Sequence, residues 1–391
     1  TEGQQQFLEM ADHRGIGVEL FGEFIPEIKF EEEKPDSSKP TIAYIHTGGT
    51  LMMVPSEKHS GALSFESAID IPKALEICDL VAHVRRRYNI VGIYLANQDS
   101  KEVMPELWTS IAATIKTVYD KIEGAVVGHG THTLEYSGAA TAFTLRSLAA
   151  PIVFTASQIP IVGYSGSDGL PNLTGAMEIA ANSDIAEVVV YTHGEILRAV
   201  RTTKKNDQRL DVFESRVTGP LGYFTAGGTE LRPGVRRRQG KRKHELVFAP
   251  RFSKHVTTLK LQPGMSPDLF EDIHRGRDVG IILETYGSGA IPQKLVPLLG
   301  RHLERGYPIL LSSSCAESGV SPSMQLHDED AIAAHTAGIR NVRDMSTGAA
   351  VVKLMNIMGN SSGLYLDEVR REMIDKSYAG EITVPKSLED F

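Results

Sequence analysis

Threonine, histidine and lysine side chains follow the predicted strands of this chain at positions where they could carry out nucleophilic chemistry. The stretch "VVGHGTHTLEYSGAA" (126–140) ends an apolar run at a glycine and then places Thr131 and His132 in the segment "HGTHT". Thr50 closes "TGGT" after another apolar run, and Lys204 lies in the segment that follows a third. A hydroxyl is a weak nucleophile that needs a base, which a desolvated lysine can supply, and glycine amides can stabilise an oxyanion. This set of residues favours acyl transfer from an amide or an ester.

The elements that must position these residues are predicted to be alternating strands and helices. The apolar runs are short and continuous, which is typical of strands buried on both faces of a parallel sheet, and segments with a 3.6-residue period lie between them. We predict strands at 41–46, 90–95, 124–129, 151–156 and 187–192. Because ligands bind beyond the carboxyl ends of the strands in open α/β sheets, we expect the site at that edge.

Composition along the chain predicts two α/β domains, an arm and a linker. The alternation stops after Ala226, where "GGTELRPGVRRRQGKRKHE" is rich in Gly, Arg and Lys, and it resumes in "VGIILETYGSGAIPQ". We predict an N-terminal arm (1–40), a larger α/β domain with the catalytic threonines (41–226), a linker with a basic loop (227–255) and a smaller α/β domain (256–391).

Charge and composition restrict the class of protein. The 391 residues carry a net charge of −8, which disfavours a nucleic-acid partner because phosphate binding needs a basic surface. The basic run at 236–243 is interpreted as a solvated loop. No stretch approaches the roughly 18 apolar residues of a membrane span, and no signal peptide is visible. The two cysteines, Cys78 and Cys315, suit a reducing compartment, so we expect a soluble cytoplasmic protein.

Five sequence blocks in the same order give the chain a resemblance to a known family. The blocks are "TGGTL", "HGTHTLEYSGAATAF", "ASQIPIVGYSGSDGLPNLTGAMEIA", "RTTKKNDQRLDVFES" and "VRDMSTGAAVVKL". They resemble the bacterial-type L-asparaginase family, and the continuation Tyr-Ser-Gly-Ala-Ala after "THTLE" is also similar to the D subunit of the Glu-tRNA(Gln) amidotransferase. The resemblance extends from about Thr41 to about Gly359, which is most of the chain.

The resemblance implies a fold, a reaction and a set of site residues. The fold is α/β, with two domains of mostly parallel sheets flanked by helices, in a homodimer or homotetramer without metal or cofactor. The reaction is hydrolysis of an amide with release of ammonia, in which water or a threonine hydroxyl attacks. The implied catalytic residues are Thr50, Thr131 and Lys204, and the implied substrate-binding residues are Gly49, Asp99, Ser100, Gly130 and His132.

The chain departs from the family pattern at His132. The family motif reads H-G-T-D-T, with an aspartate that pairs with the α-ammonium of asparagine and lies near the lysine, whereas this chain reads "HGTHT". An imidazole supplies no negative charge, and a protonated imidazole repels an ammonium. We therefore expect a small-molecule or peptidyl amide substrate that lacks a free α-ammonium. The loop "LMMVPSEKHSGALSF" (51–65) also lacks the catalytic tyrosine of the family.

Other interpretations stay open at this stage. The protein could be an ordinary L-asparaginase or glutaminase that tolerates His132. It could also be an amidotransferase-like subunit, or a non-catalytic member that binds an amide. A metal site at His129-x-x-His132 would need two further ligands, which the spacing does not provide.

Overall fold

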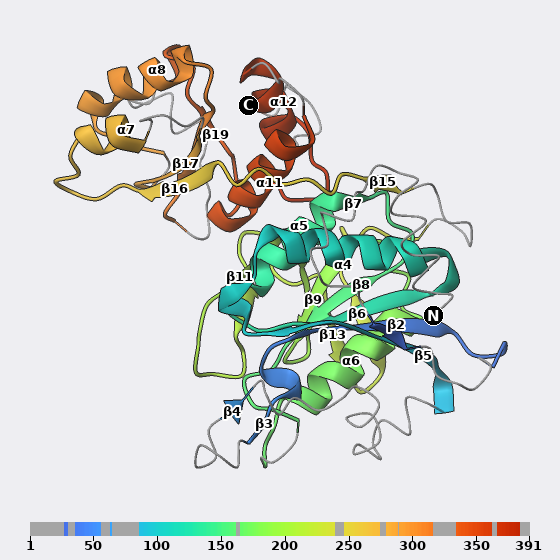
Figure 1. Cartoon of the computed structure of the whole chain (residues 1–391). Coiled ribbons are helices and arrows are strands. Elements are labelled where there is room, and N and C mark those ends of the chain that lie inside the picture. Colours follow the sequence, from blue (N-terminus) through green and yellow to red (C-terminus); the bar gives the residue numbers. More distant parts are fainter. Residues whose placement is uncertain are drawn as a thin grey trace. The chain divides into compact units, whose positions relative to one another are not determined.

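The computed structural model of the chain describes residues 27–29, 36–55, 63–64, 86–161, 165–238, 246–273, 279–287, 289–315, 334–361 and 366–383. Parts of the predicted arm (1–40), of the loop at 51–65 and of the basic run at 236–243 lie outside these residues. Contacts divide the chain into two units, one made of Thr1–Glu214 and Pro220–Phe248 and the other of Ser215–Gly219 and Ala249–Phe391. Each unit combines a sheet with helices (Figure 1).

A nine-stranded sheet forms the centre of the first unit, in the order β1-β5-β2-β6-β8-β9-β10-β13-β14. Its strands are β1 (Glu27–Lys29), β5 (Asn89–Gln98), β2 (Thr41–Gly48), β6 (Gly124–Gly128), β8 (Ile152–Thr155), β9 (Val188–Thr192), β10 (Glu195–Arg198), β13 (Gly222–Thr225) and β14 (Gly228–Leu231). The pairings from β5 to β9 are parallel, whereas the outer pairings are antiparallel. With the parallel sheet of the second unit, this arrangement confirms the predicted α/β fold class.

The central strands are buried on both faces, as their continuous apolar sequences predict. Every residue of β6 and of β9 is buried. Helices α4 (Pro105–Val118) and α5 (Leu134–Thr144) cover one face of the sheet, and α6 (Gly169–Asn182) covers the other (Figure 1). Residues of α6 such as Met177 and Ile179 pack with Tyr44 of β2 in one core cluster.

Helix α4 shows why the sequence folds as it does beside the site. Pro105 occupies its first turn, where a missing N–H costs nothing, and its buried face repeats at helical spacing through Trp108, Ile111 and Ile115. The indole Nε1 of Trp108 donates a hydrogen bond of 3.0 Å to the hydroxyl of Ser137 on α5. This contact fixes α4 against the helix whose first residues follow the "HGTHT" turn.

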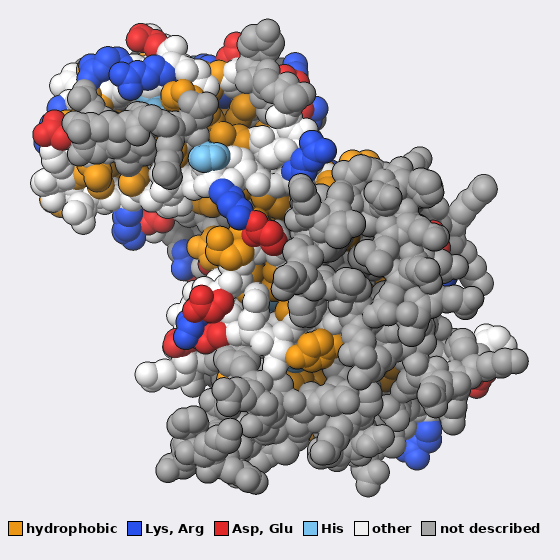
Figure 2. Space-filling model, in the orientation of Figure 1, with side chains coloured by type: hydrophobic (Ala, Val, Ile, Leu, Met, Phe, Trp, Pro, Cys, Tyr) orange, Lys and Arg blue, Asp and Glu red, His pale blue; other side chains and the backbone are white. Residues whose placement is uncertain are grey.

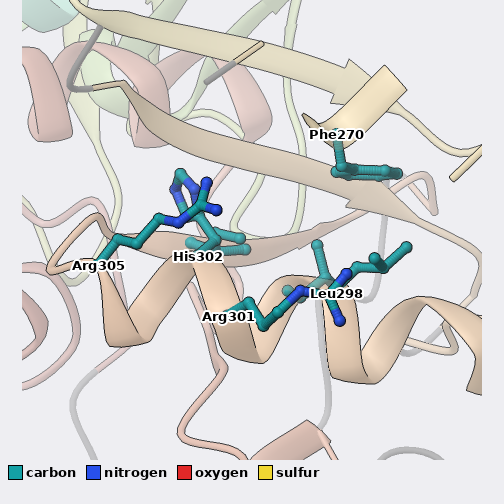
Figure 3. Close-up of a pocket in the computed structure, with 7 residues that line it drawn as sticks. Phe270, Leu298, Arg301, His302 and Arg305 are labelled. Carbon is teal, nitrogen blue, oxygen red and sulfur yellow. The ribbon is translucent and has the colours of Figure 1, made fainter. Parts of the chain in front are cut away.

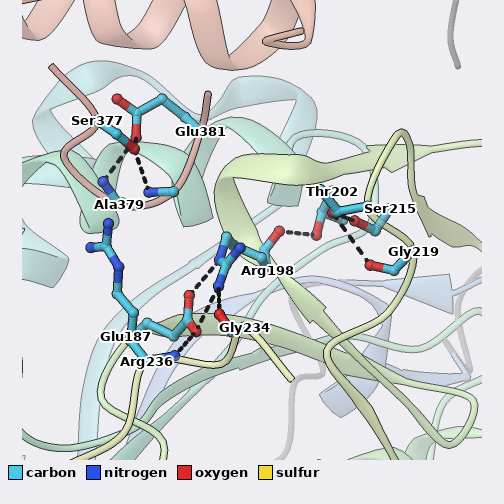
Figure 4. Close-up of polar contacts among 12 residues, drawn as sticks. Glu187, Arg198, Thr202, Ser215, Gly219, Gly234, Arg236, Ser377, Ala379 and Glu381 are labelled. Carbon is cyan, nitrogen blue, oxygen red and sulfur yellow. Dashed lines mark hydrogen bonds and ion pairs between the residues drawn. The ribbon is translucent and has the colours of Figure 1, made fainter. Parts of the chain in front are cut away.

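The second unit has a parallel four-stranded sheet in the order β16 (Val256–Lys260), β17 (Gly280–Thr285), β18 (Ile309–Ser313) and β19 (Arg340–Asn341). Its helices are α7 (Asp268–Ile273), α8 (Val296–Glu304), α11 (Thr347–Asn360) and α12 (Leu366–Ile374). Lys353 of α11 forms a fully buried ion pair with Glu381 at 2.7 Å. Glu381 also accepts a hydrogen bond from the backbone of Ala379 (Figure 4), so the buried carboxylate keeps several partners.

Short elements complete the two units. Paired two-residue strands are β3 (Val54–Pro55) with β4 (Leu63–Ser64) and β7 (Leu145–Arg146) with β15 (Val247–Phe248), and β11 (Thr202–Lys204) pairs with β12 (Phe213–Ser215). The 3-10 helices are η2 (Thr50–Met52), η4 (Ser100–Glu102), η5 (Tyr119–Lys121), η6 (Ala199–Arg201) and η7 (Gln293–Leu295).

Among the helices that the structure describes, none has the length and apolar character to cross a membrane. Figure 2 shows Lys and Arg side chains interspersed with Asp and Glu over the described part of one face.

Candidate active site

Two glycine-containing turns meet at the carboxyl edge of the first sheet. Strand β2 ends at Gly48, and the neighbouring parallel strand β6 leads into the turn that contains Gly130. Gly49 has a φ of +83°, and a Cβ atom at this position would lie 2.4 Å from the Cα of Gly130. Only glycine fits such a contact, so the turns touch backbone to backbone. Thr50 and Thr131 directly follow these glycines, so both predicted threonines belong to the contact.

Ser100 joins the third predicted turn to the same place. It begins η4 directly after β5 and is 2% exposed. Its hydroxyl accepts a hydrogen bond of 3.1 Å from the backbone N–H of His132, and its carbonyl oxygen accepts one of 2.6 Å from the hydroxyl of Thr133. A Cβ atom on Gly130 would lie 2.5 Å from the Ser100 hydroxyl. The buried serine therefore fixes the backbone of the "HGTHT" turn.

Lys204 places its amine on the hydroxyl of Thr131. The Nζ atom donates a hydrogen bond of 3.0 Å to Oγ1 of Thr131, which is buried. The backbone N–H of Lys204 donates a hydrogen bond of 2.8 Å to the carboxylate of Glu135, in the first turn of α5. The Lys204 side chain is 15% exposed, so its amine is largely shielded from water. A hydroxyl and an amine in contact are the two groups that a base-assisted attack requires.

The chain segment that carries Lys204 is anchored by a buried ion pair. Arg198, at the end of β10, donates from Nε to Glu187 at 2.6 Å and from Nη2 at 3.1 Å (Figure 4). The same guanidinium donates to the carbonyl oxygen of Gly234 at 2.8 Å, and the Arg198 carbonyl accepts from Thr202 at 2.9 Å. Because a bidentate arginine–carboxylate pair is well oriented, it fixes the start of the segment that runs through η6 and β11 to Lys204.

His132 lies between two carboxylates. Its Nδ1 is 3.5 Å from Oδ1 of Asp99, and its Nε2 is 4.0 Å from Oδ1 of Asp207. Burial acts to raise the pKa of Asp99, but hydrogen bonds from the backbone and side chain of Lys101 outweigh it, and the net shift is downward. The His132 side chain is 53% exposed, so this arrangement faces the solvent side of the site.

Asp207 is a site residue that the sequence interpretation missed. His132 replaces the family's aspartate near the lysine, but Lys204 still has a carboxylate neighbour, because Asp207 accepts a hydrogen bond from Nζ of Lys204. This hydrogen bond lowers the pKa of Asp207 below its usual range. The only sequence signal is the spacing of three residues between Lys204 and Asp207 within "KKND", which is also typical of a solvated loop.

The contacts above bring most of the predicted site residues together. Those joined by described contacts are Gly49, Asp99, Ser100, Gly130, Thr131, His132 and Lys204. Thr50 is brought there by the backbone contact of Gly49, and it starts η2. Their roles in catalysis and substrate binding stay predictions. The part of the tyrosine-free loop at 56–62 lies outside the described residues.

Two histidines next to the site are buried and neutral. Burial lowers the pKa of His46 and of His129 to about 4 each. Nδ1 of His129 lies 2.8 Å from the carbonyl oxygen of Gly130, and since a carbonyl only accepts, Nδ1 carries the proton. His129 therefore holds the turn rather than pointing with His132 at a common ligand. Within the described ranges, no group of three or more His, Cys, Asp or Glu residues is placed to hold a metal ion.

A separate small pocket belongs to the second unit. It lies between α7, α8 and β18, and Figure 3 shows Phe270, Arg301 and Arg305 around it. The described residues that line it are Phe270, Leu298, Leu299, Arg301, His302, Arg305 and Ile309. This lining offers neither a hydroxyl nor a carboxylate, so the acyl-transfer groups are those at the edge of the first sheet.

Comparisons with known proteins agree with this α/β fold. Residues 41–236 match the family model described as asparaginase, N-terminal, and residues 255–373 match the one described as glutaminase/asparaginase C-terminal domain. The chain therefore belongs to the asparaginase family, as its sequence blocks predict.

Individual relatives extend over nearly the whole chain. The D subunit of the glutamyl-tRNA(Gln) amidotransferase of Pyrococcus furiosus is 30% identical over 92% of this chain and 80% of its own length. The thermostable L-asparaginase from Thermococcus kodakarensis has a TM-score of 0.77 and 28% identity, and L-asparaginase I from Vibrio cholerae has 0.76 and 27%. Each of these two matches covers 88% of this chain and 100% of the asparaginase chain.

Proposed function

We propose that the protein hydrolyses a carboxamide to a carboxylate and ammonia. The observation that carries this proposal is the 3.0 Å hydrogen bond between Nζ of Lys204 and the hydroxyl of Thr131. A general base must lie within hydrogen-bond reach of the proton that it removes, and this pair meets that condition. The membership in the asparaginase family supports an amide as the substrate.

Each residue of the site has a role in the proposed reaction. After its ammonium group has given one proton to water, the neutral Lys204 amine takes the proton of the Thr131 hydroxyl, which lets Thr131 activate the attacking group, either water or Thr50. The backbone N–H of Gly130, in the turn that touches Gly49, is proposed to stabilise the negative charge that develops on the amide oxygen, whereas the N–H of Gly49 already donates to the carbonyl oxygen of Gln98. The proton returns to the leaving nitrogen, and ammonia departs. If Thr50 is the attacking group, water then hydrolyses the ester on Thr50 and releases the carboxylate.

We further propose that the substrate lacks a free α-ammonium. An ammonium needs a carboxylate without a cationic partner, and the two carboxylates near His132 already have such partners. Asp99 pairs with Nζ of Lys101 at 3.3 Å, and Asp207 pairs with Lys204. A buried or half-buried ammonium without a counter-charge loses affinity. Candidate substrates are N-acylated asparagine or glutamine, small amide acids and asparaginyl amides within peptides.

The proposed mechanism is tested with two nearly isosteric variants. Thr131→Val and Lys204→Met should each lower the rate of ammonia release by about 10²- to 10⁴-fold, because each removes one partner of the proton transfer. Lys205→Met is the matched control, since Lys205 is the next residue but pairs with Asp211 instead. The control should keep the wild-type rate. Wild-type turnover in either folded test variant would refute the mechanism.

A second candidate function follows from the names of the relatives. The protein of Pyrococcus furiosus is named as an amidotransferase subunit, so a role that depends on a partner protein is the alternative. We favour an enzyme that acts as a homodimer or homotetramer. Size-exclusion chromatography with light scattering on the purified chain, followed by the ammonia assay on the same fractions, distinguishes the two. A monomer that is active only with added cell extract would favour the role as a subunit.

A further inference from the structure

Asp207 makes a contact that the proposed reaction depends on. In its resting ammonium form, the Nζ atom of Lys204 has three N–H donors, and loss of the proton that faces Thr131 leaves a lone pair toward that hydroxyl. One is directed at the Thr131 hydroxyl and another at the Asp207 carboxylate. The Lys204 amine therefore contacts both the Thr131 hydroxyl and a carboxylate on its own loop.

Both the backbone N–H and the side-chain amine of Lys204 make hydrogen bonds, which distinguishes its contact with Asp207 from an ordinary surface ion pair. An exposed ion pair is worth little when two long side chains must be ordered to form it. Here the Lys204 backbone is already fixed by Glu135, and its side chain is 15% exposed. Little rotamer freedom is left to lose, so the Asp207 carboxylate can determine where the amine lies.

Asp207 also connects Lys204 to the residue that departs from the family motif. The Asp207 Oδ1 atom that accepts from Lys204 lies 4.0 Å from Nε2 of His132. The other nitrogen of the His132 ring lies 3.5 Å from Asp99. The polar groups at the site therefore follow one another as Lys204, Asp207, the His132 ring and Asp99. Lys204 thus has a carboxylate neighbour although position 132 is not a carboxylate.

We propose that Asp207 is a positioning residue, which holds the Lys204 amine against the Thr131 hydroxyl in the place of a carboxylate at position 132. This inference rests on the proposed amide hydrolysis for its effect on rate, but the pairing itself is open to a direct test. Asp207 touches neither the substrate nor the reacting atoms in this scheme. It acts only through Lys204.

The kinetic experiment compares Asp207→Asn, Asp207→Ala and Asp207→Glu with the wild type in steady-state ammonia release. Asp207→Asn and Asp207→Ala should lower kcat by about tenfold to hundredfold with little change in KM, since a displaced catalytic group slows chemistry without removing substrate contacts. Asp207→Glu should keep most of the wild-type kcat, because it retains a carboxylate at this position. Asp184→Asn is the control, because Asp184 also makes an exposed ion pair, with Arg237, outside the site. Equal kcat in Asp207→Asn and wild type overturns the proposal.

A labelling experiment needs no turnover. Brief treatment with acetic anhydride, read out by mass spectrometry, should acetylate Lys204 several-fold faster in Asp207→Asn than in wild type, because an amine released from Asp207 can move away from Thr131 and reach the reagent. Lys260, which pairs with Glu284 in the second unit, is the internal reference. If the wild-type protein releases no ammonia, the proposed function is refuted, but the pairing of Asp207 with Lys204 is not. Identical labelling of Lys204 in both proteins would overturn the pairing.

Discussion

At the scale of single residues, the buried histidines beside the site link its stability to pH. The pKa of His46 and of His129 is about 4 in the folded chain, against an ordinary value of 6.5. Between these values the unfolded chain binds protons that the folded chain does not. The folded state therefore loses stability as the pH falls from about 6.5 toward 4, and it keeps that stability above pH 6.5.

The expected change is large enough to measure. Between pH 7 and pH 5, each of these histidines should lower the free energy of unfolding by about 2 kcal/mol. Trp108, the single tryptophan, is buried in the first unit, so denaturant unfolding followed by its fluorescence reports on that unit. His129→Gln should remove about half of this pH dependence, whereas His255→Gln, at an exposed position, should leave it intact. A stability that is flat over this range would show that the two rings protonate freely in the folded chain.

Single residues also show where sequence reasoning ends. The candidate site at Thr131, Lys204 and Ser100 could be predicted because glycine-rich turns and hydroxyls follow apolar strands in a recognisable order. Asp207 could not, since its contacts with Lys204 and with His132 depend on how the loop folds, and a charged loop residue has no sequence pattern of its own. The interpretation of His132 as a loss of charge was therefore incomplete.

At the scale of elements, the contact between the two glycine turns determines whether the site can assemble. Gly49→Ala should destabilise the first unit by about 1–3 kcal/mol from backbone strain alone, since its φ is +83°. It should also lower ammonia release by about 10²-fold or more, because its Cβ would push Gly130 and Thr131 away from Thr50. Tryptophan fluorescence and the ammonia assay measure the two effects.

Gly228→Ala is the matched control for this element. Gly228 lies in the same unit with a φ of +102°, and a Cβ atom there would meet nothing within 4 Å. The Gly228→Ala variant should lose stability from backbone strain but should release ammonia at the wild-type rate. If Gly49→Ala and Gly228→Ala lose the same stability and both keep their activity, the turns after β2 and β6 do not need to touch.

The elements of the parallel core could be predicted, whereas the edges of the sheet could not. Each of the five predicted strands overlaps a strand of the structure, because burial on both faces demands continuous apolar sequence. The antiparallel additions β10, β13 and β14 have only four residues each, and most of these residues are half-buried. Half-exposed short strands carry no strong periodicity, so the sheet is wider than the sequence indicates.

At the scale of the whole molecule, the proposed chemistry resides in the first unit. Every residue of the candidate site belongs to Thr1–Glu214, and each unit has its own hydrophobic core. The second unit contributes its own parallel sheet and the buried pair of Lys353 with Glu381. Two α/β units could be predicted from the way composition alternates along the chain. The substrate could not, because it depends on a few charges at one edge.

The most direct test of the account is ammonia release by the purified protein from a panel of amides. Free L-asparagine and L-glutamine are compared with N-acetyl-asparagine and an asparagine-containing peptide, on the wild type and on His132→Asp. The wild type should release ammonia only from the blocked substrates, and His132→Asp should gain activity on free asparagine. Turnover of the free amino acids by the wild type would contradict the proposed specificity, and no release from any substrate would contradict amide hydrolysis itself.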